Sequence, residues 1–316
     1  MMQVGVMGTG AVGGYYGAML ARAGVPVVFV GRPAQAELLQ ARGLRLQSAG
    51  FDERLPVRAG ADAAALAGCT VVLCCVKSGD TETAGVQMAP HLTPGCVVLS
   101  LQNGVDNAVR LAAQLPPGRP VAPAVVYVAA SLDAPDHVHH HGRGELVLAR
   151  WPAAPGRPTP EAVQALFAQA GVPVTLADDV AAALWSKLVL NCAYNALSAI
   201  ARLPYGRLRQ GEGVEPLMRQ VVAECLAVAA ARGVHLPDPW PAVERIAATM
   251  PGQFSSTAQD LIRGKPSEID HLNGFVVREG RATGVGTPVN QALHTLVRLL
   301  EAPPPAGTAT ATAEAS

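Results

Sequence analysis

A glycine-rich segment close to the start of the printed chain, Gly8-Thr9-Gly10-Ala11-Val12-Gly13, constrains the fold more than any other feature. It follows the short apolar run Val4–Met7 and opens an Ala- and Leu-rich stretch that extends to Ala23. A G-x-G-x-x-G pattern between a strand and a helix is typical of a loop that binds the pyrophosphate of a dinucleotide.

Each glycine of this loop has an expected task. Gly8 would permit the tight turn, Gly10 would leave room for the pyrophosphate, and Gly13 would let the helix and the strand pack closely. The free amides at the start of the helix would face the phosphates. The alternative is a glycine-rich turn without a ligand, and the strand–helix context favours the binding loop.

The first half of the chain alternates between strand and helix patterns. Residues 70–76 are apolar without polar alternation, as expected of a strand buried on both faces. Such alternation predicts an α/β fold, a Rossmann-type doubly wound parallel sheet. The further expected strands are 4–7, 25–30, 96–101, 121–128 and 145–149, with a helix over 11–23.

The second half has helical patterns only. Helices are expected over 181–201, 214–232, 267–281 and 290–300. We therefore expect an NADP-binding domain over 1–176 and an all-helical substrate domain over 177–302, with the active site in the cleft between them. Residues 303–316 are of low complexity, and we expect them to be disordered.

Composition excludes several classes of protein. Of 316 residues, 50% are hydrophobic, which is enough for a sizeable core. A formal net charge of 0 gives no global attraction to nucleic acid or to an anionic membrane. There is no signal-peptide pattern and no apolar stretch of about 18 residues for a membrane span. Six cysteines without a disulfide framework or a zinc pattern point to free thiols in the cytoplasm.

Arg32 bears on the choice of cofactor. A site for NAD usually carries Asp or Glu at the end of the second strand, about 20 residues after the loop, to bind the ribose 2′-hydroxyl. Here the strand ends in Val30-Gly31-Arg32, and the next acid is Glu37. A guanidinium suits a 2′-phosphate, so NADP is favoured over NAD. The alternative is that Arg32 is a solvated loop charge.

Lys187, Asn191 and Asn195 form the second functional signal. Their spacing of four residues places them on one face of a helix, among apolar neighbours. Burial of an ammonium lowers its pKa toward a range useful for proton transfer, so a lysine with two carboxamides suggests a proton donor to a substrate oxygen. The alternative is a lysine whose ammonium reaches solvent, beside two surface amides.

Two segments near the carboxyl end form the third signal, residues 254–260 and 265–274. Pro266 and Ser267 mark an expected helix start, with Glu268 and Asp270 in its first turn. Acids in this position are commonly partners of the helix dipole, so this pattern alone leaves structure and function open.

Four histidines, His137, His139, His140 and His141, resemble a metal-binding cluster in sequence. Alternate positions along a strand share a face but do not converge on one ion without a sharp bend. We therefore expect no metal site, and place the cluster on a solvated sheet edge or in a turn.

Taken together, these motifs resemble the ketopantoate reductase (2-dehydropantoate 2-reductase) family over residues 2–300. The shared pieces occur in the family's order on the expected elements. They are the glycine loop, Arg32, Val76-Lys77, Gln102-Asn103-Gly104, the Lys187/Asn191/Asn195 helix, and Ser256 followed twelve residues later by Glu268.

The resemblance implies NADPH-dependent reduction of ketopantoate to pantoate in pantothenate synthesis. Lys187 would be the general acid, and Glu268 would help to hold the substrate hydroxyl. Asn191, Asn195 and Ser256 would bind the substrate. Lys77 and Asn103 would lie near the cofactor and the reacting centre.

Two departures from the family pattern keep the substrate open. The family often has Gln where this chain has Asp80, and a Pro where it has Ala196. The alternatives are a related NADP-dependent reductase of another 2-oxo acid and a non-catalytic NADP sensor. The sequence leaves a homodimer open.

Overall fold

A computed structural model describes residues 2–302 and divides the chain into two compact units, with the division between Leu184 and Trp185. Helix α6 (Ala181–Ala201) crosses this division. The domain boundary expected after residue 176 falls at the end of strand β10 (Val174–Ala177). The tail expected to be disordered lies outside the described residues.

The N-terminal unit is built on one sheet, which has ten strands within the described part of the chain. Strands lie in the order β4-β3-β9-β8-β7-β6-β1-β2-β5, and β10 pairs with β9. Their bounds are β1 Val4–Met7, β2 Val27–Val30, β3 Leu44–Ser48, β4 Phe51–Leu55, β5 Arg58–Gly60, β6 Val71–Cys74, β7 Val97–Ser100, β8 Val121–Ala134 and β9 His137–Ala149.

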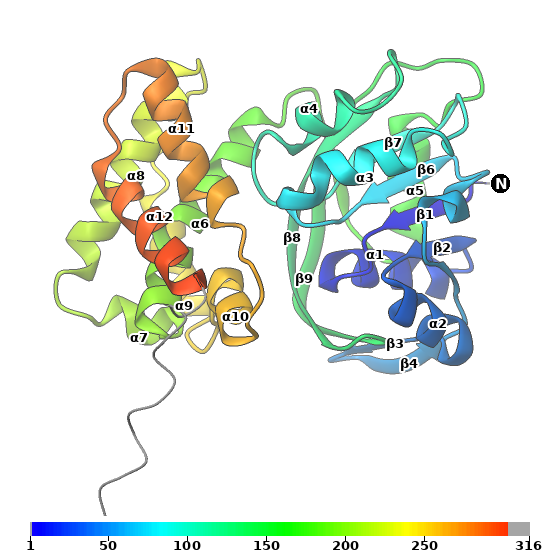
Figure 1. Cartoon of the computed structure of the whole chain (residues 1–316), viewed down its shortest axis with the longest axis horizontal. Coiled ribbons are helices and arrows are strands. Elements are labelled where there is room, and N and C mark those ends of the chain that lie inside the picture. The colour runs from blue at the N-terminus through cyan, green and yellow to red at the C-terminus, as the bar shows by residue number, and fades with distance from the viewer. Residues whose placement is uncertain (1, 303–316) are drawn as a thin grey trace, which may run out of the picture. The chain divides into compact units, whose positions relative to one another are not determined.

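Five neighbouring strands, β5, β2, β1, β6 and β7 in sheet order, form the expected parallel, doubly wound core (Figure 1). Strand β6 is buried along its whole length, as its unbroken apolar run predicts. Val71 and Leu73 pack on one face of the sheet, and Val72 and Cys74 pack on the other.

Helices cover both faces of this core. Helices α1 (Ala11–Arg22), α2 (Pro33–Arg42) and α5 (Pro160–Gln169) contribute to the apolar cluster on one face. Helices α3 (Thr81–Met88) and α4 (Asn107–Ala112), with the 3-10 turn Ala63–Leu66, contribute to the cluster on the other. This two-sided packing fixes the carboxyl ends of the parallel strands, where the expected cofactor loop lies.

The sheet differs from expectation on one side of this core, where it is mixed rather than parallel. Strand β8 starts parallel to β7 and continues into a long antiparallel hairpin with β9, and β3 pairs antiparallel with β4. Figure 1 shows the hairpin bending away from the parallel strands, with β3 and β4 at its far end. Register shifts at Tyr127/Val128, Ala129/Ala130 and Leu132/Ala134 accompany the bend.

The second unit is helical, as expected. Helix α6 has the bounds that its sequence predicts. The further helices are α7 Tyr205–Arg209, α8 Val214–Ala231, α9 Trp240–Thr249, α10 Ser256–Ile262, α11 Asn273–Thr283 and α12 Pro288–Glu301. A buried carboxamide pair supports three of them: the Asn273 amide donates to Asn290 Oδ1 at 2.9 Å, and the Asn290 amide donates to Glu224 Oε2 at 2.7 Å.

The helix expected over 267–281 starts later than predicted. Residues Ile269–His271 form a 3-10 turn, and Leu272 has φ −110° and ψ −103°, which interrupts the helical backbone. Helix α11 begins only at Asn273, so Glu268 and Asp270 precede it and are not in its first turn. Asp270 instead accepts a 2.6 Å hydrogen bond from His294.

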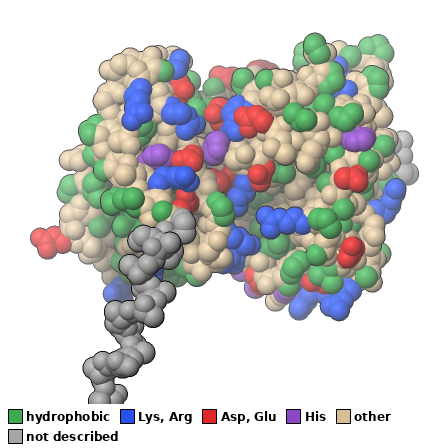
Figure 2. Space-filling view, in the orientation of Figure 1, with side chains coloured by type: hydrophobic (Ala, Val, Ile, Leu, Met, Phe, Trp, Pro, Cys, Tyr) green, Lys and Arg blue, Asp and Glu red, His purple; other side chains and the backbone are tan. Residues whose placement is uncertain are grey.

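The surface agrees with the balanced composition. On the face drawn in Figure 2, basic and acidic side chains are interspersed over both units. Within residues 2–302, no helix is long and apolar enough to cross a membrane.

Candidate functional site

The glycine loop joins β1 to α1 with three different geometries. Gly8 has φ +99°, and a Cβ there would lie 2.7 Å from the Val76 backbone nitrogen. A Cβ on Gly13 would lie 2.2 Å from the Gly8 carbonyl oxygen, so the helix can approach the strand only without a side chain. Gly10 is the N-cap of α1, and a Cβ there would meet no protein atom within 4 Å. The space over Gly10 is therefore open to a ligand.

Thr9, the second residue of the loop, is held in place from two sides. Its hydroxyl donates to the Val30 carbonyl at 3.0 Å, and its own carbonyl accepts from the Gln35 amide at 2.8 Å. The same amide nitrogen of Gln35 donates to the Pro135 carbonyl at 2.8 Å. Gln35 thus joins the loop to α2 and to the β8–β9 turn, a role for which the sequence carries no signal.

Arg32 is exposed at the carboxyl end of β2, where it is the N-cap of α2. Pro33 is the first residue of this helix, and no acid lies in its first turn. A cation at the end of β2, beside the positive end of α2, makes this corner of the sheet suitable for an anionic group.

Lys77 and Asn103 lie on adjacent loops. Lys77 is exposed and follows β6, where it precedes the 3-10 turn Ser78–Asp80. Asn103 is half-buried and follows β7, and Gly104 beside it has φ +105°. Because β6 and β7 pair in parallel, with Cys74 opposite Ser100, both residues emerge at the same edge of the sheet.

Helix α6 carries the three residues that the sequence singles out in the second unit. Lys187 and Asn191 are half-buried, and Asn195 is buried. Leu188, Val189 and Cys192 beside them are fully buried or nearly so. The lysine therefore stands at the margin of an apolar helix face rather than on a fully solvated one.

Ser256 joins this group through a contact between distant parts of the chain. The Asn195 amide donates to the Ser256 hydroxyl at 3.3 Å. The neighbouring Ser255 is the N-cap of α10 and also donates to the Asn195 carbonyl at 3.1 Å. The sequence motifs did not single out Ser255 as a cap, although a serine directly before a helical run is a recognisable N-cap.

Glu268 is half-buried and precedes the 3-10 turn Ile269–His271. Its segment is held on both sides: the Ser267 amide donates to Glu301 at 2.7 Å, and the Ile269 amide donates to the Ser267 hydroxyl at 3.2 Å. The turn conformation, rather than a helix, thus sets the position of this carboxylate.

The histidine cluster lies within β9 rather than in a turn. Strand β8 pairs along β9 and β3 pairs with residues 137–139, so His137 and His139 lie inside the sheet and not at the expected edge. The ring nitrogens of His137, His139 and His141 have hydrogen-bond partners in Gln47, Asp133 and Ser131, respectively. The His139 and His141 rings lie 4.2 Å apart, and His140 stacks on Tyr15 at 4.4 Å. Among residues 2–302, no three His, Cys, Asp or Glu side chains form a group that could hold a metal ion.

All six cysteines are free. Burial raises the pKa of the Cys74 thiol to about 12 and the pKa of the Cys75 thiol well above its usual value. Because a thiolate is the reactive form of cysteine, these raised pKa values disfavour reaction at the two thiols beside the glycine loop.

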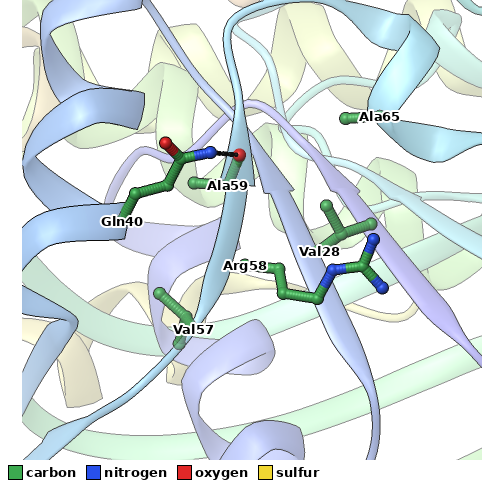
Figure 3. Close-up of a pocket in the computed structure, with 6 residues that line it drawn as sticks. All are labelled: Val28, Gln40, Val57, Arg58, Ala59 and Ala65. Carbon is green, nitrogen blue, oxygen red and sulfur yellow. Dashed lines mark hydrogen bonds between the residues drawn. The ribbon is translucent and has the colours of Figure 1, made fainter.

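One pocket, of about 270 Å³, lies away from all of these residues (Figure 3). It is at the edge of the sheet beside β2 and β5, and the Gln40 amide there donates to the Ala59 carbonyl. Its lining is Val28, Gln40, Val57, Arg58, Ala59 and Ala65.

A doubly wound sheet with a G-x-G-x-x-G loop between its first strand and first helix defines the class of the protein, a dinucleotide-binding fold of the Rossmann type. Comparison with known proteins gives the family. The family model described as ketopantoate reductase PanE/ApbA matches residues 4–153, and the model of its C-terminal domain matches residues 179–301. The chain belongs to the ketopantoate reductase PanE/ApbA family.

Individual relatives agree. The chain is 32% identical to proteins named 2-dehydropantoate 2-reductase from Mesorhizobium japonicum and Halobacterium salinarum, over 95% of its own length and 98% and 99% of theirs. A crystal structure of a PanE/ApbA family ketopantoate reductase from Ralstonia eutropha has a TM-score of 0.89 and 56% identity, covering 95% of this chain and 98% of that one. A D-mandelate dehydrogenase structure has a TM-score of 0.85 at 21% identity, over 95% of this chain and 98% of that one, and shows the shared fold.

Proposed function

We propose that this protein catalyses the NADPH-dependent reduction of 2-dehydropantoate (ketopantoate) to pantoate, a step of pantothenate synthesis. The observation that carries the proposal is the polar face of α6, where Lys187, Asn191 and Asn195 follow one another at helical spacing and Asn195 contacts Ser256. The names of the relatives support the same substrate.

The residues of the N-terminal unit fit a dinucleotide. The open space over Gly10, at the positive end of α1, suits a pyrophosphate. Arg32 at the end of β2 suits the 2′-phosphate that distinguishes NADPH from NADH, since no acid stands there to bind a 2′-hydroxyl. When bound, the reduced nicotinamide supplies a hydride to the keto carbon of the substrate.

In this proposal the residues of the chain manage the charge and position of the substrate. Negative charge develops on the keto oxygen as the carbon is reduced, and the Lys187 ammonium neutralises it by giving up its proton. Asn191, Asn195 and Ser256 orient the substrate through hydrogen bonds. Glu268 accepts a hydrogen bond from the substrate hydroxyl, because an ionised carboxylate only accepts.

Lys77 and Asn103 are the further residues of the N-terminal unit that we assign to binding. Both emerge at the carboxyl edge of the parallel sheet, where ligands of doubly wound folds bind. We assign Lys77 to the cofactor, and Asn103 to both the cofactor and the substrate. No metal takes part in the proposed reaction.

A second candidate is a reductase of the same type acting on another 2-oxo acid. Asp80 and Ala196 favour it, because both depart from the family pattern. A steady-state comparison of ketopantoate with other branched and with aromatic 2-oxo acids separates the two candidates. The proposal predicts the highest kcat/KM for ketopantoate, and a higher value for another acid would contradict it.

A non-catalytic NADP sensor is the third candidate, and the lysine-bearing helix argues against it, since a sensor needs no proton donor. Tight NADP binding together with no NADPH oxidation by any 2-oxo acid would favour the sensor. We also propose that the enzyme acts in the cytoplasm, where its free cysteines remain reduced.

A further inference from the structure

A buried side chain that no sequence motif singles out, Asn107, joins the two loops that carry Lys77 and Asn103. Asn107 is 3% exposed and is the first residue of α4. Its amide donates to the Asn103 backbone carbonyl at 2.5 Å and to the Ser78 hydroxyl at 3.1 Å. One carboxamide therefore holds the loop after β7 and the turn after β6.

The other end of the same carboxamide is also occupied. Asn107 Oδ1 lies 3.1 Å from the Thr81 hydroxyl and accepts from Arg110 at 3.2 Å. Both donor hydrogens of the Asn107 carboxamide are thus bonded, and its oxygen accepts from Arg110 and shares the Thr81 hydroxyl hydrogen with the Ser78 carbonyl, which lies 3.0 Å from that hydroxyl. A buried polar group that is fully bonded fixes its neighbours in one arrangement.

Bonds around Asn107 extend this arrangement to both loops. The Ser78 hydroxyl donates to the Asn103 carbonyl at 2.8 Å, and Arg110 donates to the Ser78 carbonyl at 2.9 Å. The buried Gln102 amide, next to Asn103, donates to the Thr81 hydroxyl at 2.7 Å. The network therefore contacts Asn103 directly, through its backbone carbonyl, and reaches Lys77 through one peptide bond, since Ser78 is its immediate neighbour.

We propose that Asn107 is a positioning residue, which sets the spacing between the Lys77 turn and the Asn103 loop and thereby preorganises the cofactor edge of the sheet. The inference rests on the proposed function, because it acts through the roles assigned to Lys77 and Asn103. A purely structural role, starting α4 and filling the core, would affect stability without affecting either loop.

Asn107→Asp tests the proposal most sharply. The aspartate keeps an acceptor for Thr81 and Arg110 but replaces the donating nitrogen by an oxygen that faces the Asn103 carbonyl. The second variant, Thr81→Val, is nearly isosteric and weakens the network without touching Asn103. The matched control is Gln164→Leu, which removes a half-buried 2.7 Å bond to the Val174 carbonyl elsewhere in the same unit.

Amide hydrogen exchange and cofactor affinity are the two readouts. In Asn107→Asp we expect faster exchange in residues 76–80 and 102–106, together with an NADPH affinity or a kcat about 10-fold to 100-fold lower, as for a misplaced site. Thr81→Val should show the same pattern at smaller size, and Gln164→Leu should show neither effect. The proposal would be overturned if amide hydrogen exchange in Asn107→Asp were unchanged in either loop. It would also be overturned if exchange were faster but NADPH affinity and kcat equalled those of the wild type.

The same experiment separates this inference from the proposed function. If the wild-type protein reduces no 2-oxo acid, the proposed function fails. Amide hydrogen exchange and the affinity for NADPH or NADH, whichever cofactor the protein binds, then still decide the role of Asn107. If Asn107→Asp does not fold, Thr81→Val decides it by the same two readouts.

Discussion

The side-chain amide of Asn195 donates a 3.3 Å hydrogen bond to the hydroxyl of Ser256, 61 residues further along the chain. Ser255 strengthens this junction, because its hydroxyl donates to the Asn195 carbonyl and accepts from the Ala258 amide at the start of α10. The junction brings into contact two side chains that we propose bind the substrate. It also ties α10 to the helix that carries Lys187.

Replacement of Lys187 by alanine should remove the proposed proton donor. We expect kcat to fall by about 10²- to 10⁴-fold, the usual effect of losing a general acid, while NADPH affinity stays near that of the wild type. Lys187→Arg should not restore kcat fully, because arginine keeps the charge but does not release a proton. Steady-state kinetics with saturating substrate and NADPH fluorescence titration measure the two effects.

Lys265→Ala is the matched control, since Lys265 is an exposed lysine of the same unit. It should leave kcat unchanged. If Lys187→Ala retains more than about a tenth of the wild-type kcat, another group delivers the proton.

Arg32 should set the choice between the two nicotinamide cofactors. Arg32→Ala removes a charge-assisted contact that only NADPH can make, worth roughly 1.5–3 kcal/mol, so the affinity for NADPH should fall about 10- to 150-fold. The affinity for NADH should change little. Arg42→Ala, at the other end of α2, is the control. Equal losses for both cofactors would show that Arg32 has only a structural role.

Substitutions at two of the three loop glycines, Gly10 and Gly13, should have different effects. Gly10→Val projects a side chain into the open space over the loop, so we expect cofactor binding to be lost with the fold retained. Gly13→Ala forces a Cβ against the Gly8 carbonyl, so we expect the free energy of unfolding to fall by about 1–3 kcal/mol. NADPH titration and chemical unfolding distinguish them, and normal NADPH binding by Gly10→Val would disprove the assignment of the phosphate loop.

Acid should weaken the contact between Arg54 and Asp136. The Arg54 guanidinium donates to Asp136 at 2.8 Å and holds the pKa of that carboxyl below its usual range. Ionised Asp136 therefore stabilises the fold above the ordinary carboxyl pKa of about 3.9, and this contribution is lost as pH falls through the lower folded value.

Chemical unfolding across pH tests this expectation. The difference in free energy of unfolding between the wild type and Asp136→Asn should shrink as the pH is lowered from about 5 to about 2. Asp178→Asn controls for the loss of a surface carboxylate, because the Asp178 side chain is 95% exposed. A difference for Asp136→Asn that grows toward low pH would contradict the sign of the shift.

The parts of the fold that sequence could predict are those with a local cause. Helix α6 has an unbroken Ala- and Leu-rich pattern, and its predicted bounds match the structure. Strand β6 was predicted because an apolar run without alternation needs two buried faces. The glycine loop could be predicted as well, since its G-x-G-x-x-G pattern is complete within six consecutive residues.

The parts that sequence did not predict depend on partners far along the chain. Strand β4 reads Phe51–Leu55 with three charged residues inside it, and only pairing with β3 makes it a strand. The sequence predicts only residues 145–149 of β9 as a strand, because the polar run at His137–His141 has no strand pattern of its own and becomes a strand by pairing with β8 and β3. Asn107, Gln35 and the Asn195–Ser256 contact are tertiary features, which no spacing in the sequence encodes.

Hydride transfer to a named product tests the central claim most directly. The protein would be incubated with ketopantoate and NADPH that carries deuterium at the reactive C4 position, and the product analysed by mass spectrometry. The account predicts pantoate with a single deuterium on C2, formed by the wild type and at a strongly reduced rate by Lys187→Ala. Absence of labelled pantoate from a folded protein that binds NADPH would contradict it.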